Sequence, residues 1–531
     1  MHIREFLAID NVERADGDLE QEINGLTYDS RQAGPGRLFF AVAGEKVDGH
    51  DYITEAVRRG AAAVVFSRQE ISPQAPAAIR VKNVRRTMAL WAAEFFGRPS
   101  ERLTLVGVTG TNGKTTLSYL VESILHAAGL EPGVIGTVNY RFQGREFPSH
   151  HTTPEAIDLQ QMLNDMLRSG VRSVAMEASS HALAQERVRA LAFDIGVFTN
   201  LSRDHLDYHH DMEDYFLAKS RLFTDYLSAS PKPHKAAVIF GEDPRAQELF
   251  GMLRGTNIDV WSYGEGSPWD VRPLRVERDV KGLRGTVQAR TNIIDFNSTL
   301  VGAANLQNIL GAIGVASALK LDPGAIAEGI DKLRSVPGRL EKVPNRLGVT
   351  ILVDYAHSPD ALEKVLGAVR PLTGGKLITV FGCGGDRDRG KRPVMGEIAG
   401  RLSDVTVLTS DNPRSESPIA ILEEIEAGMR RTEAIRLDIA TLRSPNAESR
   451  RSIPESKRGY FVEANRRTAI GIALSIARAG DLVLIAGKGH EDYQILGTEK
   501  IHFDDREVAR QEAEAGAGAI THEEWAGASK N

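Results

Sequence analysis

Short apolar runs that end in glycine or charge, and are then followed by a helical pattern, recur along most of this chain. The clearest case begins at Leu103–Val108, an apolar and partly β-branched run typical of a buried parallel strand. Glycines follow it, and apolar residues then recur from Leu117 to Leu125 at the three-to-four spacing of an amphipathic helix. The pattern predicts a strand, a glycine-rich turn and a helix in this order.

Similar apolar runs predict further strands in the rest of the chain. They are Leu38–Val42, Val171–Met176, Ile195–Phe198, Val349–Val353, Leu377–Phe381, Val405–Leu408 and Leu482–Ala486. Because 531 residues are too many for one core, we expect an α/β protein of three domains. The expected limits are 1–100 for an N-terminal α/β domain, 101–336 for a central doubly wound sheet, and 337–531 for a Rossmann-like α/β domain.

Composition narrows the functional classes. The chain is 42% hydrophobic and 26% charged, which is ordinary for a globular protein, and its net charge of −6 disfavours a nucleic-acid partner. A single cysteine, Cys383, excludes an internal disulfide and fits a reducing compartment. The sequence has neither a signal-peptide pattern nor an apolar run of about 18 residues. We therefore expect a cytoplasmic protein that does not insert into membranes.

The turn after the first strand has the chemistry of a phosphate site. Backbone N–H groups at a helix start bind phosphate, a lysine adds charge, and a hydroxyl can reach Mg²⁺. The strict phosphate-loop motif would place glycine at Val108, so its first glycine is missing. The arrangement still predicts an ATP site. The residues expected to form it are Gly110, Thr111, Asn112, Gly113, Lys114, Thr115 and Thr116.

Two further segments carry titratable residues at strand ends. Glu177 follows the strand at 171–176, where an acidic residue suits Mg²⁺. Five of the twelve residues at 199–210 are Asp or His, which is too polar for a core. Zinc is the alternative, but the spacing matches no structural zinc motif and no cysteine is near. We therefore favour metal-assisted ATP chemistry.

These motifs, in this order, resemble the Mur ligase family, whose members use ATP to join amino acids to carboxylates. The resemblance implies that His205 binds magnesium and that Lys219 is carbamoylated by CO₂, so that its new carboxylate also binds the metal beside Thr115 and Glu177. A lysine on an amphipathic helix such as Tyr215–Phe223 is otherwise usually exposed. The resemblance also implies that Asn308 lies near the adenine, with Arg339 and Asp354 as further ATP contacts.

A sugar nucleotide is the second substrate that the resemblance implies. The segment Asp29-Ser30-Arg31 resembles a UDP-binding segment of the family, although Asp and Ser in a turn can simply cap their own backbone. Thr152 and Thr153 precede a predicted helix and could likewise only cap it. The residues expected at this site are Tyr28, Ser30, Glu45, Lys46, Val47, Thr152, Thr153, Ser179, Gln185 and Arg187.

The third substrate is expected at the C-terminal strand ends, three of which present charged loops to one edge. The loop at 382–392 lacks the G-x-G-x-x-G spacing and carries four Arg or Lys residues, which suits an anionic substrate. The sequence Asp-Asn-Pro-Arg at 411–414 resembles the branch of the family that adds meso-diaminopimelate, although Arg414 could instead pair with Glu416. The residues expected to bind this amino acid are Arg387, Asp411, Asn412, Pro413, Arg414, Gly487 and Glu491.

The resemblance implies one reaction, in which UDP-MurNAc-L-Ala-D-Glu, meso-diaminopimelate and ATP give a tripeptide, ADP and phosphate. A ligase that uses lysine or another diamino acid, and a folylpolyglutamate-type ligase, are the alternatives. A non-catalytic ATP-binding switch protein is disfavoured because such a protein would not need Glu177, His205 and Lys219. We expect a monomer whose partners are these small molecules.

Overall fold

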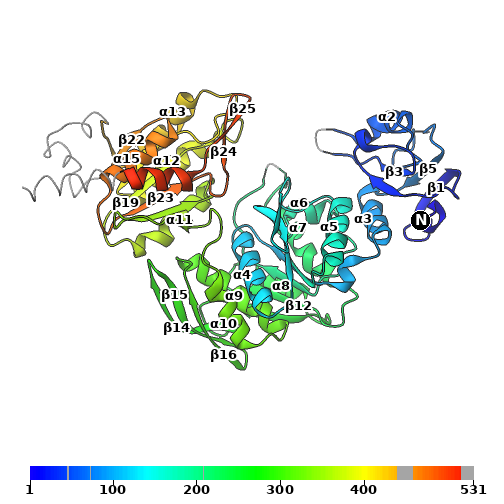
Figure 1. Cartoon of the computed structure of the whole chain (residues 1–531), viewed down its shortest axis with the longest axis horizontal. Coiled ribbons are helices and arrows are strands. Elements are labelled where there is room, and N and C mark those ends of the chain that lie inside the picture. Colours follow the sequence, from blue (N-terminus) through cyan, green and yellow to red (C-terminus); the bar gives the residue numbers. More distant parts are fainter. Residues whose placement is uncertain (45–46, 72, 207, 439–457, 516–531) are drawn as a thin grey trace, which may run out of the picture. The chain divides into compact units, whose positions relative to one another are not determined.

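The computed structural model describes residues 1–44, 47–71, 73–206, 208–438 and 458–515, and its helices and strands are labelled in Figure 1. The chain divides into two compact units. The first comprises Met1–Pro273, Gln288–Ile294 and Asn308–Gly329, and the second comprises Leu274–Val287, Asp295–Gln307 and the described part of Ile330–Asn531. The three domain limits expected from the sequence stay predictions. No helix within the described ranges is both long and apolar enough to cross a membrane.

The first unit begins with a five-stranded sheet in the order β1-β5-β4-β3-β2, with β1 antiparallel to β5 and the other pairs parallel. Its strands are β1 (Val12–Gly17), β2 (Gly25–Thr27), β3 (Arg37–Phe40), β4 (Ala63–Phe66) and β5 (Ala77–Val81), and its helices are α1 (Ile3–Leu7), α2 (Ile53–Arg58) and α3 (Val84–Phe95). Trp91 of α3 is fully buried, and the same core includes Ala156 and Ile157 of α5 (Ala156–Arg168).

The second sheet has the order β16-β15-β14-β13-β12-β11-β6-β10-β7-β8-β9. Its parallel part includes β6 (Thr104–Thr109), β7 (Pro132–Ile135), β10 (Ser173–Glu177), β11 (Ile195–Phe198), β12 (Ala236–Phe240) and β13 (Asp259–Tyr263). The strand β6 lies between β10 and β11, so three carboxyl ends meet at the centre of the sheet, where open α/β sheets bind ligands. Its helices also include α6 (Ser180–Ala184), α7 (Met212–Arg221), α8 (Ala246–Met252) and α10 (Pro323–Lys332).

The predicted alternation of strand and helix fails at two places in this sheet. Strands β8 (Asn139–Phe142) and β9 (Arg145–Pro148) form an antiparallel extension, and β14 (Val271–Asp279), β15 (Gly282–Ala289) and β16 (Asn292–Ser298) follow one another without a helix. Between β8 and β9 the physical reason is a tight hairpin turn of two residues, Gln143 and Gly144. Their φ values of +48° and +71° are those that such a turn requires. In the segment from β14 to β16, buried and exposed residues alternate along β16. This alternation is typical of antiparallel strands with one face exposed to solvent.

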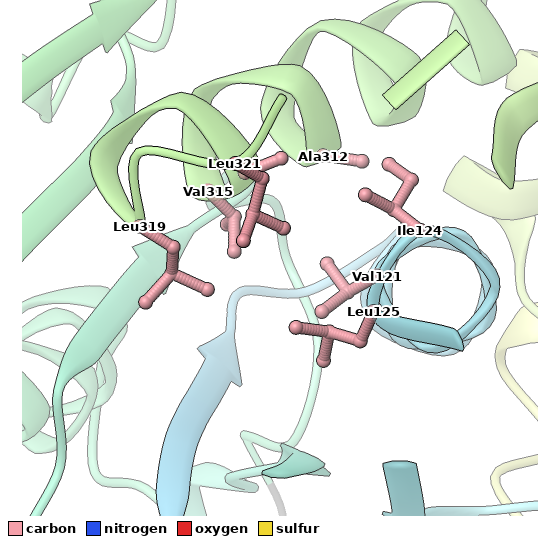
Figure 2. Close-up of a pocket in the computed structure, with 8 residues that line it drawn as sticks. Val121, Ile124, Leu125, Ala312, Val315, Leu319 and Leu321 are labelled. Carbon is pink, nitrogen blue, oxygen red and sulfur yellow. The ribbon is translucent and has the colours of Figure 1, made fainter. Parts of the chain in front are cut away.

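The helix that follows the phosphate-loop turn, α4 (Lys114–Ala127), packs against α9 (Ala303–Ala318) through apolar side chains. Figure 2 shows Val121, Ile124 and Leu125 of α4 facing Ala312, Val315, Leu319 and Leu321 across a small apolar pocket. The two helices approach each other closely at Gly311, where a Cβ would lie 2.8 Å from Leu117 Cδ1. The glycine-rich turn is therefore backed by a tightly packed pair of helices.

The second unit contains a seven-stranded sheet in the order β17-β18-β23-β19-β20-β22-β21, antiparallel only at β17 (Glu341–Lys342). Its other strands are β18 (Thr350–Asp354), β19 (Leu377–Phe381), β20 (Val405–Leu408), β21 (Ile435–Arg436), β22 (Gly459–Val462) and β23 (Leu482–Ala486), with a separate hairpin of β24 (Tyr493–Leu496) and β25 (Glu499–His502).

Helices cover both faces of this sheet. Leu484 of β23 belongs to the core that contains α11 (Pro359–Val369), α12 (Lys391–Leu402) and α13 (Pro418–Met429), whereas its neighbour Val483 belongs to the core that contains α15 (Arg466–Ile476) (Figure 1). Successive residues of a strand point to opposite faces, so these are the two sides of a doubly wound sheet. The strands predicted at 195–198, 377–381, 405–408 and 482–486 are found at those residues.

We expect Leu125→Ala to lower the free energy of unfolding of the first unit by about 2–5 kcal/mol, since it empties a buried leucine site. Leu217→Ala on α7 is the matched control, because Leu217 is 46% exposed and should lose less than about 1 kcal/mol. Denaturant unfolding followed by fluorescence measures both. Equal losses would contradict the packing between α4 and α9.

Candidate functional site

The predicted phosphate loop is a real turn between β6 and α4, and glycine is required at both of its bends. Gly110 and Gly113 have φ of +138° and +89°, and a Cβ at Gly110 would lie 1.9 Å from Thr199 Oγ1. The loop is also bound from the side, because Asn112 N donates to Asn200 Oδ1 at 3.0 Å and Thr199 Oγ1 donates to the Asn112 carbonyl at 2.6 Å. Asn308 of α9 lies against this loop, since its Oδ1 would be 2.5 Å from a Cβ at Gly113.

Two lysines meet at one carbonyl oxygen of this loop. Lys114 Nζ donates to the Gly110 carbonyl at 2.9 Å, and Lys219 Nζ from α7 donates to the same oxygen at 2.8 Å. Lys219 is only 1% exposed, so it is buried, whereas a lysine on a helix is usually exposed to solvent. Burial, and to a smaller degree the Lys114 ammonium, lower the pKa of Lys219 well below its usual value. Burial therefore shifts Lys219 toward its neutral amine, relative to an exposed lysine.

The carboxylate of Glu177 lies beside the phosphate loop. Its Oε1 accepts hydrogen bonds from Thr115 Oγ1 at 3.0 Å and from Thr137 N at 2.9 Å, and its Oε2 accepts one from Thr137 Oγ1 at 3.0 Å. Glu177 is 1% exposed, and Gly136 makes room for it, because a Cβ there would lie 2.6 Å from Glu177 Oε1. A buried carboxylate and a hydroxyl are thus adjacent, which is a donor set that suits Mg²⁺.

His205 lies in the loop after β11, in a left-handed conformation with φ of +53°. Its ring centroid is 4.9 Å from that of His181 and 6.0 Å from that of Tyr215, whose ring in turn lies 4.3 Å from Lys219 Nζ. The Tyr215 ring is therefore near both the His205 ring and Lys219 Nζ. In the described ranges no three His, Cys, Asp or Glu side chains are arranged as a metal site.

The polar residues predicted for the sugar nucleotide form one network near the end of β10. Thr153 does not cap α5. Its hydroxyl donates to the Glu177 carbonyl at 2.8 Å and accepts from Ser179 N at 3.1 Å. Arg187 donates to the Thr153 carbonyl at 3.0 Å and to Gln185 Oε1 at 2.7 Å. Thr152 joins the network through Thr137, at 3.1 Å between the two hydroxyl oxygens.

Of the N-terminal residues expected to bind the sugar nucleotide, only some are connected to this network. Tyr28 donates to Asp158 of α5 at 2.6 Å, one turn from Glu155, which pairs with Arg187 at 3.0 Å. Asp29 caps the turn at Ser30–Gln32 by accepting from Arg31 N, so turn chemistry is present at this segment. Val47 is 57% exposed, and Glu45 and Lys46 lie outside the described residues.

Arg339 and Asp354 lie together in the second unit. Asp354 Oδ2 accepts from Leu340 N at 2.8 Å, and its Oδ1 accepts from Ala356 N at 2.9 Å. Burial raises the pKa of Asp354, and the nearby Arg339 opposes this. The Arg339 guanidinium lies 4.9 Å from the centre of the Tyr355 ring. Asp354 therefore shapes the turn that presents Arg339.

The residues predicted for the amino-acid substrate converge at the carboxyl ends of β19, β20 and β23. Asn412 is central to them, because its Nδ2 donates to Glu491 Oε2 at 3.0 Å and its Oδ1 accepts from Lys488 Nζ at 3.1 Å. Asp411 Oδ1 lies 3.5 Å from the same ammonium. Burial raises the pKa of Glu491, and Lys488 opposes this.

Arg414 does not form the alternative pair with Glu416. Its Nη1 donates to the Gly385 carbonyl at 2.7 Å, whereas Glu416 pairs with Arg392 at 2.8 Å. Pro413 precedes Arg414, whose φ is +52°, and Arg414 N donates to the Ile495 carbonyl of β24 at 3.1 Å. Arg387 and Arg414 approach the same side of Gly384, where a Cβ would be 2.9 Å from Arg414 Nη1 and 3.8 Å from Arg387 Cγ.

Sequence reasoning missed two fully buried cations at this edge. Lys488 is surrounded by Asp411, Asn412 and Glu491, and Arg466 of α15 pairs with Asp505 at 2.6 Å. Arg466 also donates to the carbonyls of Ser410 and Ala486, at 3.4 and 3.0 Å, and so joins the ends of β20 and β23. Gly487, with φ of +117°, lies 3.9 Å from Arg466 Nη2, measured from where its Cβ would be. The only sign of these buried cations in the sequence is that Lys488 lies between two glycines, Gly487 and Gly489.

Family models match three stretches of the chain. They are described as the Mur ligase family catalytic domain over residues 22–95, the Mur ligase middle domain over residues 108–316, and the Mur ligase glutamate ligase domain over residues 338–489. Similar proteins include the UDP-N-acetylmuramoyl-L-alanyl-D-glutamate--2,6-diaminopimelate ligases of Geobacter metallireducens and Geobacter sulfurreducens. The first is 49% identical over 96% of this chain and 97% of its own, and the second is 48% identical over 93% and 95%.

Solved structures agree with these matches. A structure of a UDP-N-acetylmuramoyl-L-alanyl-D-glutamate--2,6-diaminopimelate ligase has a TM-score of 0.69 and 30% identity, and covers 97% of this chain and 99% of its own. A folylpolyglutamate synthase from Mycobacterium tuberculosis has a TM-score of 0.60 at 18% identity, over 76% of this chain and 92% of its own, and shares the fold alone. On the extent of these matches, the chain belongs to the Mur ligase family.

Proposed function

We propose that this chain is the ATP-dependent ligase that joins meso-2,6-diaminopimelate to the D-Glu carboxylate of UDP-MurNAc-L-Ala-D-Glu in peptidoglycan synthesis. The observation that carries the substrate assignment is the meeting of Asn412, Arg414 and Glu491 at one sheet edge. A guanidinium and a carboxylate there match the carboxylates and ammonium groups of a diamino dicarboxylic acid. The names of the relatives at 48–49% identity support the same assignment.

The phosphate loop and its lysines suit the first half of the reaction. A carboxylate acylates amines poorly, so ATP transfers its γ-phosphoryl group to the D-Glu carboxylate and gives an acyl phosphate and ADP. The loop N–H groups at the start of α4 and the Lys114 ammonium stabilise the negative charge of the phosphates. The neutral amine of diaminopimelate then attacks the acyl carbon, the amide forms, and phosphate leaves. Exclusion of water protects the acyl phosphate from hydrolysis.

Glu177, Thr115, His205 and a carbamate on Lys219 are the residues that we propose hold Mg²⁺. The buried Glu177–Thr115 pair fits such an ion, and Mg²⁺ would neutralise phosphate charge. The neutral Lys219 amine that burial favours is the form that adds CO₂, with loss of one proton, to give a carbamate. The ammonium form has no lone pair and cannot add it.

The network around Thr153, Ser179, Gln185 and Arg187, with Tyr28 and Ser30, is our proposed site for the sugar nucleotide, and Asn308, Arg339 and Asp354 are proposed ATP contacts. Hydroxyls and arginine suit a diphosphate and its sugars. We further propose that the protein acts as a cytoplasmic monomer. A folylpolyglutamate-type function is disfavoured, because likeness to those synthases extends only to the fold.

Lys114→Ala should reduce turnover by roughly a hundredfold or more, the scale for one lost preorganised charge, without unfolding the protein. Phosphate release in the presence of UDP-MurNAc-L-Ala-D-Glu, diaminopimelate and ATP measures it. Lys364→Ala, which removes an exposed lysine of α11 paired with Asp360, is the control and should stay near wild type. Near-normal ligation by Lys114→Ala would sink the phosphate-loop assignment.

Lys219→Ala and Lys219→Arg should both be nearly inactive, because neither can carry a carbamate. Added formate or acetate should partly restore Lys219→Ala by supplying the missing carboxylate. Lys219→Arg keeps the positive charge and serves as the matched control, which these anions should not restore. Mass spectrometry or crystallographic density showing an unmodified lysine in the active, Mg²⁺-supplied enzyme would refute the carbamate.

Arg414→Ala should cost diaminopimelate about 2–5 kcal/mol in kcat/KM, the range for truncating one partner of a buried charge pair. The poor rate with lysine, which lacks the distal carboxylate, should change little. An amino-acid panel in the ligase assay measures both, with Arg401→Ala on α12 as the control for an exposed arginine. Equal losses with both amino acids, or with neither, would show that Arg414 does not read that carboxylate.

A further inference from the structure

One peptide group, which joins Gly385 to Asp386, lies between two charged side chains. Its carbonyl oxygen accepts a hydrogen bond from Arg414 Nη1 at 2.7 Å, and its N–H donates to Glu416 Oε1 at 2.6 Å. The carbonyl and N–H of a trans peptide point in opposite directions. The guanidinium of Arg414 and the carboxylate of Glu416 are therefore held on opposite sides of this group, although they are only two residues apart in the chain.

The side chain that holds Glu416 in this position is Arg392. Its Nη2 lies 2.8 Å from Glu416 Oε1 and its Nη1 lies 2.9 Å from Glu416 Oε2. The guanidinium therefore contacts the carboxylate in a bidentate manner. Arg392 has no exposed side-chain surface, and it also donates to Glu424 at 2.9 Å and to the Gly384 carbonyl at 3.3 Å. The hydrogen bonds from Arg392 lower the pKa of Glu416 to about 2, so this carboxylate stays ionised.

We propose that Arg392 is a positioning residue for substrate selection. By holding Glu416 on the N–H side of the Gly385–Asp386 peptide, it keeps the Arg414 guanidinium available to the distal carboxylate of the amino-acid substrate. The inference deepens the proposed function and rests on it, since it concerns the same carboxylate. In this role Arg392 acts on the substrate only through Glu416 and Arg414.

The physical reason is competition for the Arg414 guanidinium. The competitors are the Glu416 carboxylate of the protein and the distal carboxylate of the amino-acid substrate. The bond to the Gly385 carbonyl uses one of the five N–H donors of Arg414. Without Arg392, Glu424 would keep Arg389 as a partner, whereas Glu416 would lose both of its contacts with Arg392 and keep only the hydrogen bond from the Asp386 N–H. A carboxylate tethered two residues away has a high effective concentration, and it would compete with the substrate for Arg414. Asp386 competes less, because it accepts from Ser415 Oγ at 2.6 Å.

Three variants test this positioning role: Arg392→Gln, Glu416→Gln and the double variant. We expect Arg392→Gln to raise KM for diaminopimelate about tenfold, within the range for coupled neighbours, while kcat and KM for ATP stay within about twofold. Glu416→Gln alone should behave as wild type. The double variant should recover KM for diaminopimelate to within about threefold of wild type, because the internal competitor has gone.

Thermal unfolding separates positioning from a merely structural role. Arg392→Gln should lower the Tm, and the double variant should keep that lower Tm while its KM recovers. If Arg392→Gln does not fold, Arg392→Lys replaces it, with a smaller rise in KM that Glu416→Gln again removes. A KM that stays high in the double variant, or a KM for ATP that rises in parallel, would overturn the role of Arg392. Equal wild-type rates with lysine and diaminopimelate would instead overturn the proposed function.

Discussion

The carbonyl oxygen of Gly110 accepts hydrogen bonds from the Nζ atoms of two lysines, and much of the first unit is arranged to make this possible. Gly110 can turn its carbonyl toward Lys114 and Lys219 because it has no Cβ, which would meet Thr199. Lys219 reaches the same oxygen from a different helix, at a point where it is shielded from water. Two positive charges that lie close together and are shielded from water repel each other strongly. Loss of a proton from one of the two lysines removes this repulsion. This constraint makes the chemistry of Lys219 differ from that of an ordinary lysine.

The second unit resolves its charges differently, by pairing three buried cations near the carboxyl ends of its strands with carboxylates. Lys488 is balanced by Asp411 and Glu491, Arg466 by Asp505, and Arg392 by two glutamates. Buried pairs of this kind add little net stability, but they fix geometry because removing one partner leaves a buried charge. The loops that follow β20 and β23 are thereby held in one arrangement, because Arg466 donates to the Ser410 carbonyl in the loop after β20 and to the Ala486 carbonyl at the end of β23.

Local pattern and parallel topology explain what could be predicted from the sequence. Strands such as Leu377–Phe381 are short, continuous and apolar, and the carboxyl ends of parallel strands meet, which brought Glu177 beside Thr115. Burial of charge could not be predicted, because it depends on partners that are distant in the chain. Arg392 meets Glu416 across 24 residues and Arg466 meets Asp505 across 39, and each arginine lies at a helix start where an exposed residue is usual. The helical pattern around Lys219 likewise gives no sign of the carbonyl that it reaches.

The backbone of Arg414 has a consequence for how such a site changes during evolution. Arg414 has a left-handed φ of +52°, its N–H donates to Ile495 at 3.1 Å, and its carbonyl accepts from Gly497 at 2.9 Å. The residue is thus bound to the β24–β25 hairpin on both sides, whatever side chain it carries. A lineage that exchanged only this side chain would inherit a loop still shaped for a guanidinium. On the proposed role of Arg414, divergence to a new amino-acid substrate would therefore proceed through linked changes in two separate segments.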